Sequence, residues 1–292
     1  HKGEKILPAG FFITVLATTG VLIVLALLSV FLPVNDLNIA GMTMSVYNLI
    51  SQYILIIGSI VALVFLAVAG NEKRAAAGLT RQNWKSAVFI VLLFVGIYIV
   101  RTVVSMAGQG VSDGSGMQYV KEWAAMFKNP MMWLNIAALP INYFFVFIAF
   151  FGEEYGWRYY LQPVLQKRFG LRAGVIILGV VWGLWHIPDD LFYYTQTSGI
   201  QMIFAQQITC ISLGIFFAYA YMKTQNIWVP VCLHYLNNNL IPIISGTFSA
   251  DVLENQTVSW KDLPVALVLN GLCFGFFLLA DVFKKKEVQE EE

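Results

Sequence analysis

Long apolar stretches separated by short polar connections dominate the chain. The hydrocarbon core of a bilayer is roughly 30 Å thick, so a helix that crosses it needs about 20 apolar residues. Eight stretches predict such helices, at residues 11–32, 46–69, 87–107, 132–151, 173–187, 200–222, 227–245 and 264–283. The fifth and seventh are the weakest, because each is short or interrupted by polar groups and each contains a histidine. We therefore expect an all-α, polytopic membrane protein with about eight transmembrane helices and no soluble domain.

The composition agrees with this pattern. The chain has 292 residues, of which 58% are hydrophobic and 12% are charged, whereas a soluble domain is about half apolar and a quarter charged. The net charge of +1 gives no reason to expect a nucleic-acid partner. The three cysteines (Cys210, Cys232 and Cys273) form no C-x-x-C motif, and we expect them to pack as small apolar side chains.

The basic residues predict the orientation of the spans, since short cytoplasmic loops are enriched in lysine and arginine. Most of them lie in alternate connections (residues 70–86 and 162–172, and Lys223) and in the tail after residue 283. Lys121 and Lys128 are exceptions on the opposite side. Both termini are therefore predicted to be cytoplasmic.

Two adjacent carboxylates and an arginine follow the apolar fourth span. An ionised carboxylate at membrane depth costs several kcal/mol, so Glu153 and Glu154 are functional candidates. On a helix Glu154 and Arg158 are four residues apart and share one face, whereas Glu153 points elsewhere. This predicts that Arg158 neutralises Glu154 and that Glu153 is the reactive carboxylate. The alternative is a structural ion network near the headgroups.

A histidine ends the fifth predicted span, in Trp182-Gly183-Leu184-Trp185-His186-Ile187-Pro188. Trp182 and His186 are one helical turn apart, and Pro188 stops or bends the helix. Imidazole can exchange a proton or bind a metal near neutral pH. The alternative is a hydrogen-bonding histidine between helices. We expect Asp189 and Asp190 to cap the following loop.

The seventh predicted span contains His234-Tyr235-Leu236-Asn237-Asn238-Asn239. His234 and Asn238 are four residues apart, so both donors face one direction. Three buried amides without partners would cost a few kcal/mol each, so this segment must face a cavity, water or other polar groups. The alternative is that the asparagines only connect helices.

Together these groups form the set that hydrolysis by an activated water requires. Glu153 and His186 could activate the water, and His234 and Asn238 could donate hydrogen bonds to an oxyanion. A metal site is the second use of the same residues, because Glu153, His186 and His234 would form a catalytic zinc set with an open fourth position. The spacing does not choose between these uses.

The three motifs, Glu153-Glu154-x-x-x-Arg158, Trp182-x-x-x-His186 and His234-x-x-x-Asn238, resemble the CPBP family. This family of intramembrane endopeptidases includes CAAX proteases and bacteriocin-processing (Abi) proteins. The resemblance covers residues 133–245 and carries no signature in the segments 1–132 (spans one to three) and 246–292 (last span and charged tail). We treat these three segments as the domains of the chain.

The resemblance implies a CAAX-protease-like helical bundle with an active site that opens toward the cytoplasm. By it, Glu153 and His186 activate water, His234 and Asn238 form the oxyanion site, and Glu154 and Arg158 are structural. The expected substrate is a membrane-associated protein or peptide, and the expected location is the bacterial plasma membrane. Zn²⁺ is an open possibility, since the family is often described as metalloproteases and a glutamate-dependent mechanism has also been argued. Trp182 replaces the more common phenylalanine, which is a conservative change.

The predicted spans leave one geometric problem. Glu153 would lie at the cytoplasmic end of its span, whereas His186 lies about 14 residues beyond Arg172, or roughly 21 Å along a helix. Either the helix continues past Arg158 inside the bilayer, or residues 162–171 form a re-entrant or interfacial segment. We favour the second, because Pro163 and Gly170 bracket this segment.

Two other classes of function are compatible with the same residues. A proton-coupled secondary transporter could use Glu153, His186 and Arg158 as a relay, although the halves of the chain show no inverted repeat. A catalytically silent scaffold or immunity protein would have no evident need for all the polar groups of the set.

Overall fold

The computed structural model describes residues 7–39, 42–246 and 255–284. Its contacts divide the chain into two compact units. Unit 1 contains the residues up to Thr80 together with Ala138–Glu154, and unit 2 contains Arg81–Ala137 and the residues from Tyr155 onward. The division by sequence into residues 1–132, 133–245 and 246–292 stays a prediction.

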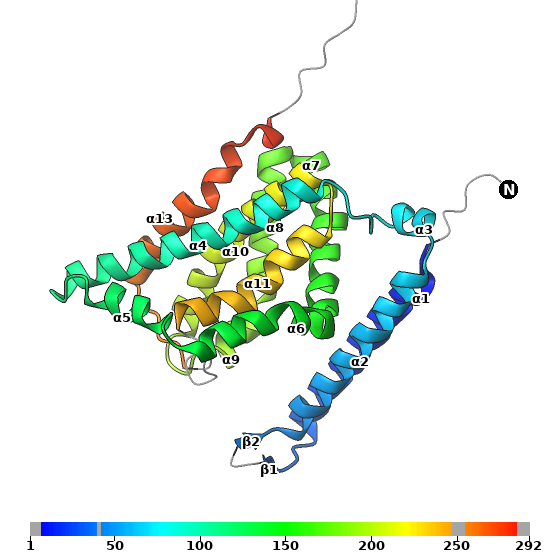
Figure 1. Cartoon of the computed structure of the whole chain (residues 1–292), viewed down its shortest axis with the longest axis horizontal. Helices are drawn as coiled ribbons and strands as arrows, with labels where there is room; N and C mark the ends of the chain where they lie inside the picture. The colour runs from blue at the N-terminus through cyan, green and yellow to red at the C-terminus, as the bar shows by residue number, and fades with distance from the viewer. Residues whose placement is uncertain (1–6, 40–41, 247–254, 285–292) are drawn as a thin grey trace, which may run out of the picture. The chain divides into compact units, whose positions relative to one another are not determined.

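Unit 1 is built on a helical hairpin of α1 (Ala9–Phe31) and α2 (Val46–Val68). The two helices lie side by side and are joined by a short antiparallel ribbon of β1 (Leu37–Ile39) and β2 (Met42–Met44), where the sequence predicted only a loop (Figure 1). The hairpin packs tightly, because a Cβ atom at Gly58 would overlap the side chain of Thr18. The helix α3 (Asn71–Ala76) follows α2.

The long helix α6 (Pro130–Glu154) contributes to both units. Its second half belongs to unit 1, where the rings of Phe11 and Phe151 meet edge to face with centroids 4.9 Å apart. No loop follows Glu154, because the chain continues as the π-helix η1 (Tyr155–Leu161) and then as α7 (Gln162–Phe169). The helical chain therefore continues without a break past Arg158 to Phe169, and the re-entrant or interfacial position of residues 162–171 stays a prediction.

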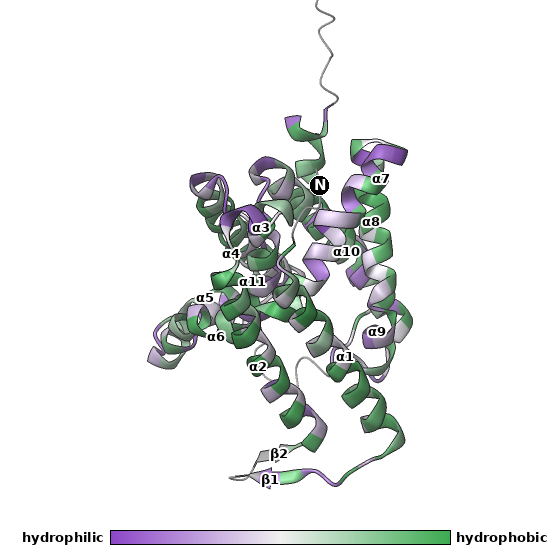
Figure 2. Ribbon diagram, turned by 90° about the vertical axis from the view of Figure 1, so that its right-hand side faces the viewer, coloured by the Kyte–Doolittle hydropathy of each residue, from purple (hydrophilic) through white to green (hydrophobic). Residues whose placement is uncertain are grey.

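Unit 2 surrounds the buried helix α10 (Gly199–Thr224). The helices packed against it include α4 (Trp84–Ser112), α8 (Leu171–Trp185), α9 (Ile187–Phe192), α11 (Trp228–Ser245) and α13 (Asp262–Cys273). The short helix α5 (Gln118–Met126) packs on α4. The helix α7 turns at Gly170 and folds back along α8, and it is largely hydrophilic, whereas α1 and α2 are apolar along their length (Figure 2).

Small residues allow α8 and α10 to cross closely. A Cβ atom at Gly179 would lie 2.6 Å from Cα of Ile211, and Gly214 faces Gly179 across the same contact. A side chain at Gly179 would push the helix backbones apart, as at other small-residue contacts between membrane helices. This crossing fixes α8, which carries Trp182 and His186, against α10.

Two asparagines fix the start of α4 to the turn between α10 and α11. The side chain of Asn83, which has a positive φ of 49°, donates to the carbonyl of Thr224 at 2.9 Å. The side chain of Asn226 donates to the carbonyl of Gln82, also at 2.9 Å. These reciprocal bonds set the start of α4 beside the start of α11, and the two helices pack against each other.

The all-α polytopic membrane fold is confirmed, but the count of eight spans is not. Among the residues that the structure describes, six helical segments are long and apolar enough to cross a membrane: Ala9–Phe31, Val46–Val68, Trp84–Ser112, Pro130–Phe169, Leu171–Phe192 and Gly199–Thr224. The helix α11 falls short because its polar residues lower its mean hydropathy. The predicted eighth span is not one helix, since α13 ends at Cys273 and is followed by the 3₁₀ helices η2 (Gly275–Leu279) and η3 (Asp281–Phe283).

Candidate functional site

A buried arginine sits on the π-helix. Arg158 has no exposed surface, and its Nη1 donates to the carbonyl of Gly214 on α10 at 3.1 Å. Its guanidinium carbon lies 5.2 Å from the ring centre of Trp182 and 5.6 Å from that of Phe217. A planar guanidinium can stack on aromatic faces and bond a carbonyl at its edge, which a lysine ammonium cannot do. Arg158 therefore ties η1 to α8 and α10.

Trp182 is the common neighbour of the polar groups in unit 2. Its buried ring meets His186 at 5.9 Å and His234 at 5.5 Å between centroids, with interplanar angles of 65° and 76°. The structure therefore brings together Arg158, His186 and His234, which the sequence placed on three separate helices. The indole orients both imidazoles by edge-to-face contact.

His186 ends α8 and has a defined tautomer. Its Nδ1 lies 2.9 Å from the carbonyl oxygen of Trp182, and that oxygen can only accept a hydrogen bond. In the neutral imidazole Nδ1 therefore carries the hydrogen, and Nε2 keeps the lone pair. The Sγ atom of Cys210 on α10 lies 3.8 Å from the same Nδ1. The half-buried ring thus presents a basic nitrogen away from α8.

The residues after His186 differ from the prediction. Instead of a loop, they form the short helix α9, which holds Asp189 and Asp190 in its first turn. Asp190 is fully buried, and neither of its carboxylate oxygens accepts a hydrogen bond from the residues that the structure describes. The prediction that Asp190 caps a loop is therefore wrong.

His234 and Asn238 lie one turn apart on α11, as predicted. His234 is buried between Trp182 and Phe217, whereas Asn238 is exposed. The Oδ1 atom of Asn238 accepts a hydrogen bond from Nδ2 of Asn237 at 2.9 Å. Because its oxygen is occupied, Asn238 has its amide N–H groups available for a ligand.

The two glutamates are the last residues of α6. Glu154 is fully buried and Glu153 is half-buried. Both belong to unit 1, whereas Arg158 and the imidazoles belong to unit 2. The pairing of Glu154 with Arg158 and the approach of Glu153 to His186 therefore stay predictions. The π-helix that begins directly after Glu154 is a feature often found at functional sites.

Among residues 7–39, 42–246 and 255–284, no three His, Cys, Asp or Glu side chains gather in a group that could hold a metal ion. Unit 2 brings His186 and His234 to one indole, but the third expected zinc ligand, Glu153, belongs to unit 1. The zinc set therefore stays a prediction.

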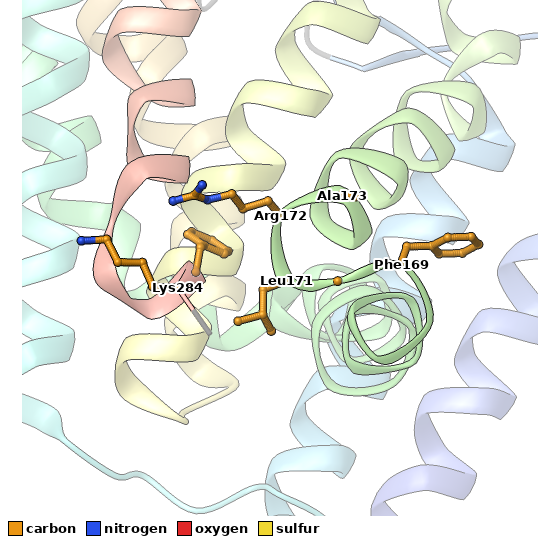
Figure 3. A pocket seen from close by; sticks show the side chains of 7 residues that line it. Phe169, Leu171, Arg172, Ala173 and Lys284 are labelled. Carbon is orange, nitrogen blue, oxygen red and sulfur yellow. The ribbon is translucent and has the colours of Figure 1, made fainter. Parts of the chain in front are cut away.

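A pocket of about 500 Å³ lies elsewhere in unit 2, where α7 turns into α8. Figure 3 shows Phe169, Leu171, Arg172 and Lys284 around it. None of the predicted site residues lines this pocket. The polar set around Trp182, rather than this pocket, is therefore the candidate site.

Comparison with known proteins points to the same part of the chain. Residues 135–240 match the family described as type II CAAX prenyl endopeptidase Rce1-like. This range includes all three motifs that the sequence analysis singled out. These residues are therefore similar to the Rce1-like family, in line with the resemblance of the three motifs to CAAX proteases.

One curated relative is also similar to the chain. The chain is 27% identical over 125 residues to CAAX prenyl protease 2 of Methanococcus maripaludis. The alignment covers 40% of this chain and 45% of the relative, so the chain spans less than half the length of the protein it matches. No solved structure matches the chain.

The sequence analysis missed the part played by two residues near the candidate site. Cys210 was expected only to pack, and it does so beside the imidazole of His186. Tyr98 donates a hydrogen bond to Oδ1 of Asn237, and nothing in the motifs points to this tyrosine. Its hydroxyl lies in a mostly apolar span that also contains Arg101, Thr102 and Ser105, so it does not stand out in the sequence.

Proposed function

We propose that this protein is an intramembrane endopeptidase of the CAAX type that hydrolyses a peptide bond in a membrane-associated protein or peptide. The match of residues 135–240 to the Rce1-like family and the likeness to a CAAX prenyl protease support the class of reaction. The geometry of His186 carries the proposal, because a histidine with Nδ1 bonded to a carbonyl presents Nε2 as a base.

In this mechanism Glu153 and His186 activate one water molecule. The water oxygen attacks the carbonyl carbon of the scissile peptide bond, while its proton passes to this pair. Neutral Nε2 of His186 can accept the proton because Nδ1 already donates to Trp182. Charge develops on the carbonyl oxygen as the carbon becomes tetrahedral. The C–N bond then breaks, and the proton held by the pair passes to the leaving amine.

His234 and Asn238 stabilise the oxyanion in this proposal. Both lie on one face of α11, and the amide oxygen of Asn238 is already engaged, so its N–H groups are the ones left for a substrate. Removing one such donor costs about 10²- to 10³-fold in kcat in well-studied hydrolases. Glu154 and Arg158 hold the helices rather than take part in the chemistry, which the buried contacts of Arg158 support.

The test is cleavage of a quenched peptide library by purified protein in proteoliposomes. We expect Glu153→Ala, His186→Ala and His234→Ala to abolish cleavage while the protein still folds. Glu72→Ala, at an exposed glutamate on α3, is the matched control and should cleave normally. Full cleavage by the Glu153 variant would refute its role as the base.

The same preparation decides the use of a metal. One carboxylate and two imidazoles are a chemically suitable zinc set, and a zinc ion bound by Glu153, His186 and His234 would lower the pKa of a bound water. Metal analysis and cleavage with and without a chelator distinguish a zinc-dependent from a glutamate-dependent reaction. Proton-coupled uptake without cleavage would instead favour a transporter. The absence of both cleavage and uptake in the wild-type protein would favour a silent scaffold.

We also propose that the protein lies in the bacterial plasma membrane with both termini in the cytoplasm. The support is the distribution of lysine and arginine among the connections. Labelling of single introduced cysteines from each side of the membrane tests this orientation, and an external label at residue 74 would contradict it.

A further inference from the structure

Two hydrogen bonds join α4 to the polar face of α11. The hydroxyl of Tyr98 donates to Oδ1 of Asn237, and Nδ2 of Asn237 donates to Oδ1 of Asn238 at 2.9 Å. Tyr98 and Asn237 are 139 residues apart in the chain, so the contact depends on the packing of α4 against α11. The three side chains form a single row of polar groups that ends at the exposed amide of Asn238.

The surroundings of Tyr98 determine which groups donate and which accept along this row of hydrogen bonds. Its buried ring lies between Phe94 and Phe274, each with its centroid 5.0 Å away, and the guanidinium of Arg101 lies 5.9 Å from the ring centre. Asn237 supplies the acceptor for the phenol in the part of the chain described. If the Asn237 amide turned over, the buried hydroxyl would lose its acceptor, which costs about 1–3 kcal/mol.

The orientation of the Asn237 amide determines the orientation of the Asn238 amide. An asparagine amide has an oxygen and a nitrogen of nearly equal size, so shape alone does not resist its rotation. The oxygen of Asn237 is held by Tyr98, and its nitrogen therefore faces Asn238. Oδ1 of Asn238 accepts this hydrogen bond, so the N–H groups of Asn238 face a ligand. A reversed amide would present an oxygen to an oxyanion and repel it.

We infer that Tyr98 and Asn237 are positioning residues that orient the Asn238 amide so that its N–H groups face the oxyanion. This inference rests on the proposed peptidase function and on the oxyanion role of Asn238 within it. Neither Tyr98 nor Asn237 contacts the substrate, and both act through Asn238.

The first test is Tyr98→Phe, which removes one oxygen atom and keeps the ring between its aromatic neighbours. We expect kcat to fall about tenfold, the effect of one net hydrogen bond of roughly 1.4 kcal/mol, with KM within about twofold of wild type. Tyr53→Phe, at an exposed tyrosine on α2, is the control and should leave both parameters unchanged. Wild-type kcat in the Tyr98 variant would overturn the inference.

The second test is Asn237→Asp, which has nearly the same shape but cannot donate to Asn238. Its carboxylate still accepts from Tyr98 and would also draw the Asn238 N–H groups toward itself. We therefore expect a larger loss of kcat than in Tyr98→Phe, at a similar thermal unfolding midpoint. If kcat falls only because the thermal unfolding midpoint falls, Asn237 has a merely structural role and the positioning role is refuted.

The deciding measurement is a double-mutant cycle. If Tyr98 acts through Asn238, Tyr98→Phe has no further effect on kcat in the Asn238→Ala background. Additive effects would refute the inference while leaving the peptidase proposal intact. Wild-type protein that cleaves no peptide of the library would instead refute the peptidase proposal, so the two failures are distinguishable.

Discussion

Replacing Gly179 with alanine adds one methyl group where α8 crosses α10. The new Cβ would lie 2.6 Å from Cα of Ile211, 3.2 Å from its Cγ1 and 3.3 Å from the carbonyl oxygen of Cys210. Carbon atoms prefer a separation of about 3.5–4.0 Å, so the two helices must move apart by about 1 Å. The nearest atom belongs to the backbone, so no side-chain rotation can relieve the contact.

Overpacking of this kind typically costs about 1–3 kcal/mol. The same substitution in an open helical position gains about 0.5–1 kcal/mol, because alanine is a better helix former than glycine. Gly96 on α4 is such a position, since a Cβ there meets no atom within 4 Å. We therefore expect Gly179→Ala and Gly96→Ala to change the free energy of unfolding in opposite directions.

Thermal unfolding in detergent, followed by a thiol-reactive dye, measures this difference. Cys210 is buried beside Gly179 and becomes reactive when α8 and α10 separate. A destabilisation of about 2 kcal/mol would lower the midpoint by about 4–8 °C. Equal midpoints for the two variants would refute the close crossing of α8 and α10. Because this crossing also holds His186 near α10, the Gly179 variant should lose cleavage at a lower temperature than wild type.

Two further outcomes follow from other contacts. Arg158→Lys keeps the charge but loses the planar group that stacks on two rings and bonds to Gly214. The free energy of unfolding should therefore fall by about 1.5–3 kcal/mol. An unchanged thermal midpoint would contradict this role of Arg158. Hydrogen bonds from Ser115 and Tyr119 hold the pKa of exposed Asp113 below its ordinary value of 3.8. Because the pKa of Asp113 is lower in the folded protein, its ionised carboxylate stabilises this turn at pH values above 3.8. This stabilisation is lost as the pH falls through the lowered pKa. Protection of the Ser115 amide from hydrogen exchange, corrected for the intrinsic rate, should therefore decrease in acid in wild type and not in Asp113→Asn; equal behaviour of both would contradict the assignment.

The sequence predicted the helical membrane fold well, because hydropathy reports directly on which segments are apolar. Predicted span two begins at the same residue as α2, and predicted span seven ends at the same residue as α11. Hydropathy does not report where a helix ends or changes its type within an apolar segment. It therefore missed the end of α13 at Cys273 and the change from α-helix to π-helix at Tyr155. These breaks depend on local backbone geometry and packing rather than on mean hydropathy.

The candidate site was predicted in its residues but not in its supporting contacts. His186, His234 and Asn238 could be selected because each is costly inside an apolar segment. The position of Trp182 between both imidazoles could not be predicted, because an aromatic residue in an apolar helix gives no signal of its partners. Tyr98 was missed for the same reason, since its partner Asn237 is distant in the chain.

The early end of α8 has a consequence for the reactivity of its last side chain. The backbone N–H of His186 bonds to Gly183, three residues back, and so leaves the carbonyl of Trp182 to the imidazole. If α8 continued as a regular α-helix through this position, the backbone N–H would occupy that carbonyl and the ring would be free to exchange its hydrogen between the two nitrogens. The tight last turn of α8 thus holds the hydrogen of the neutral imidazole on Nδ1.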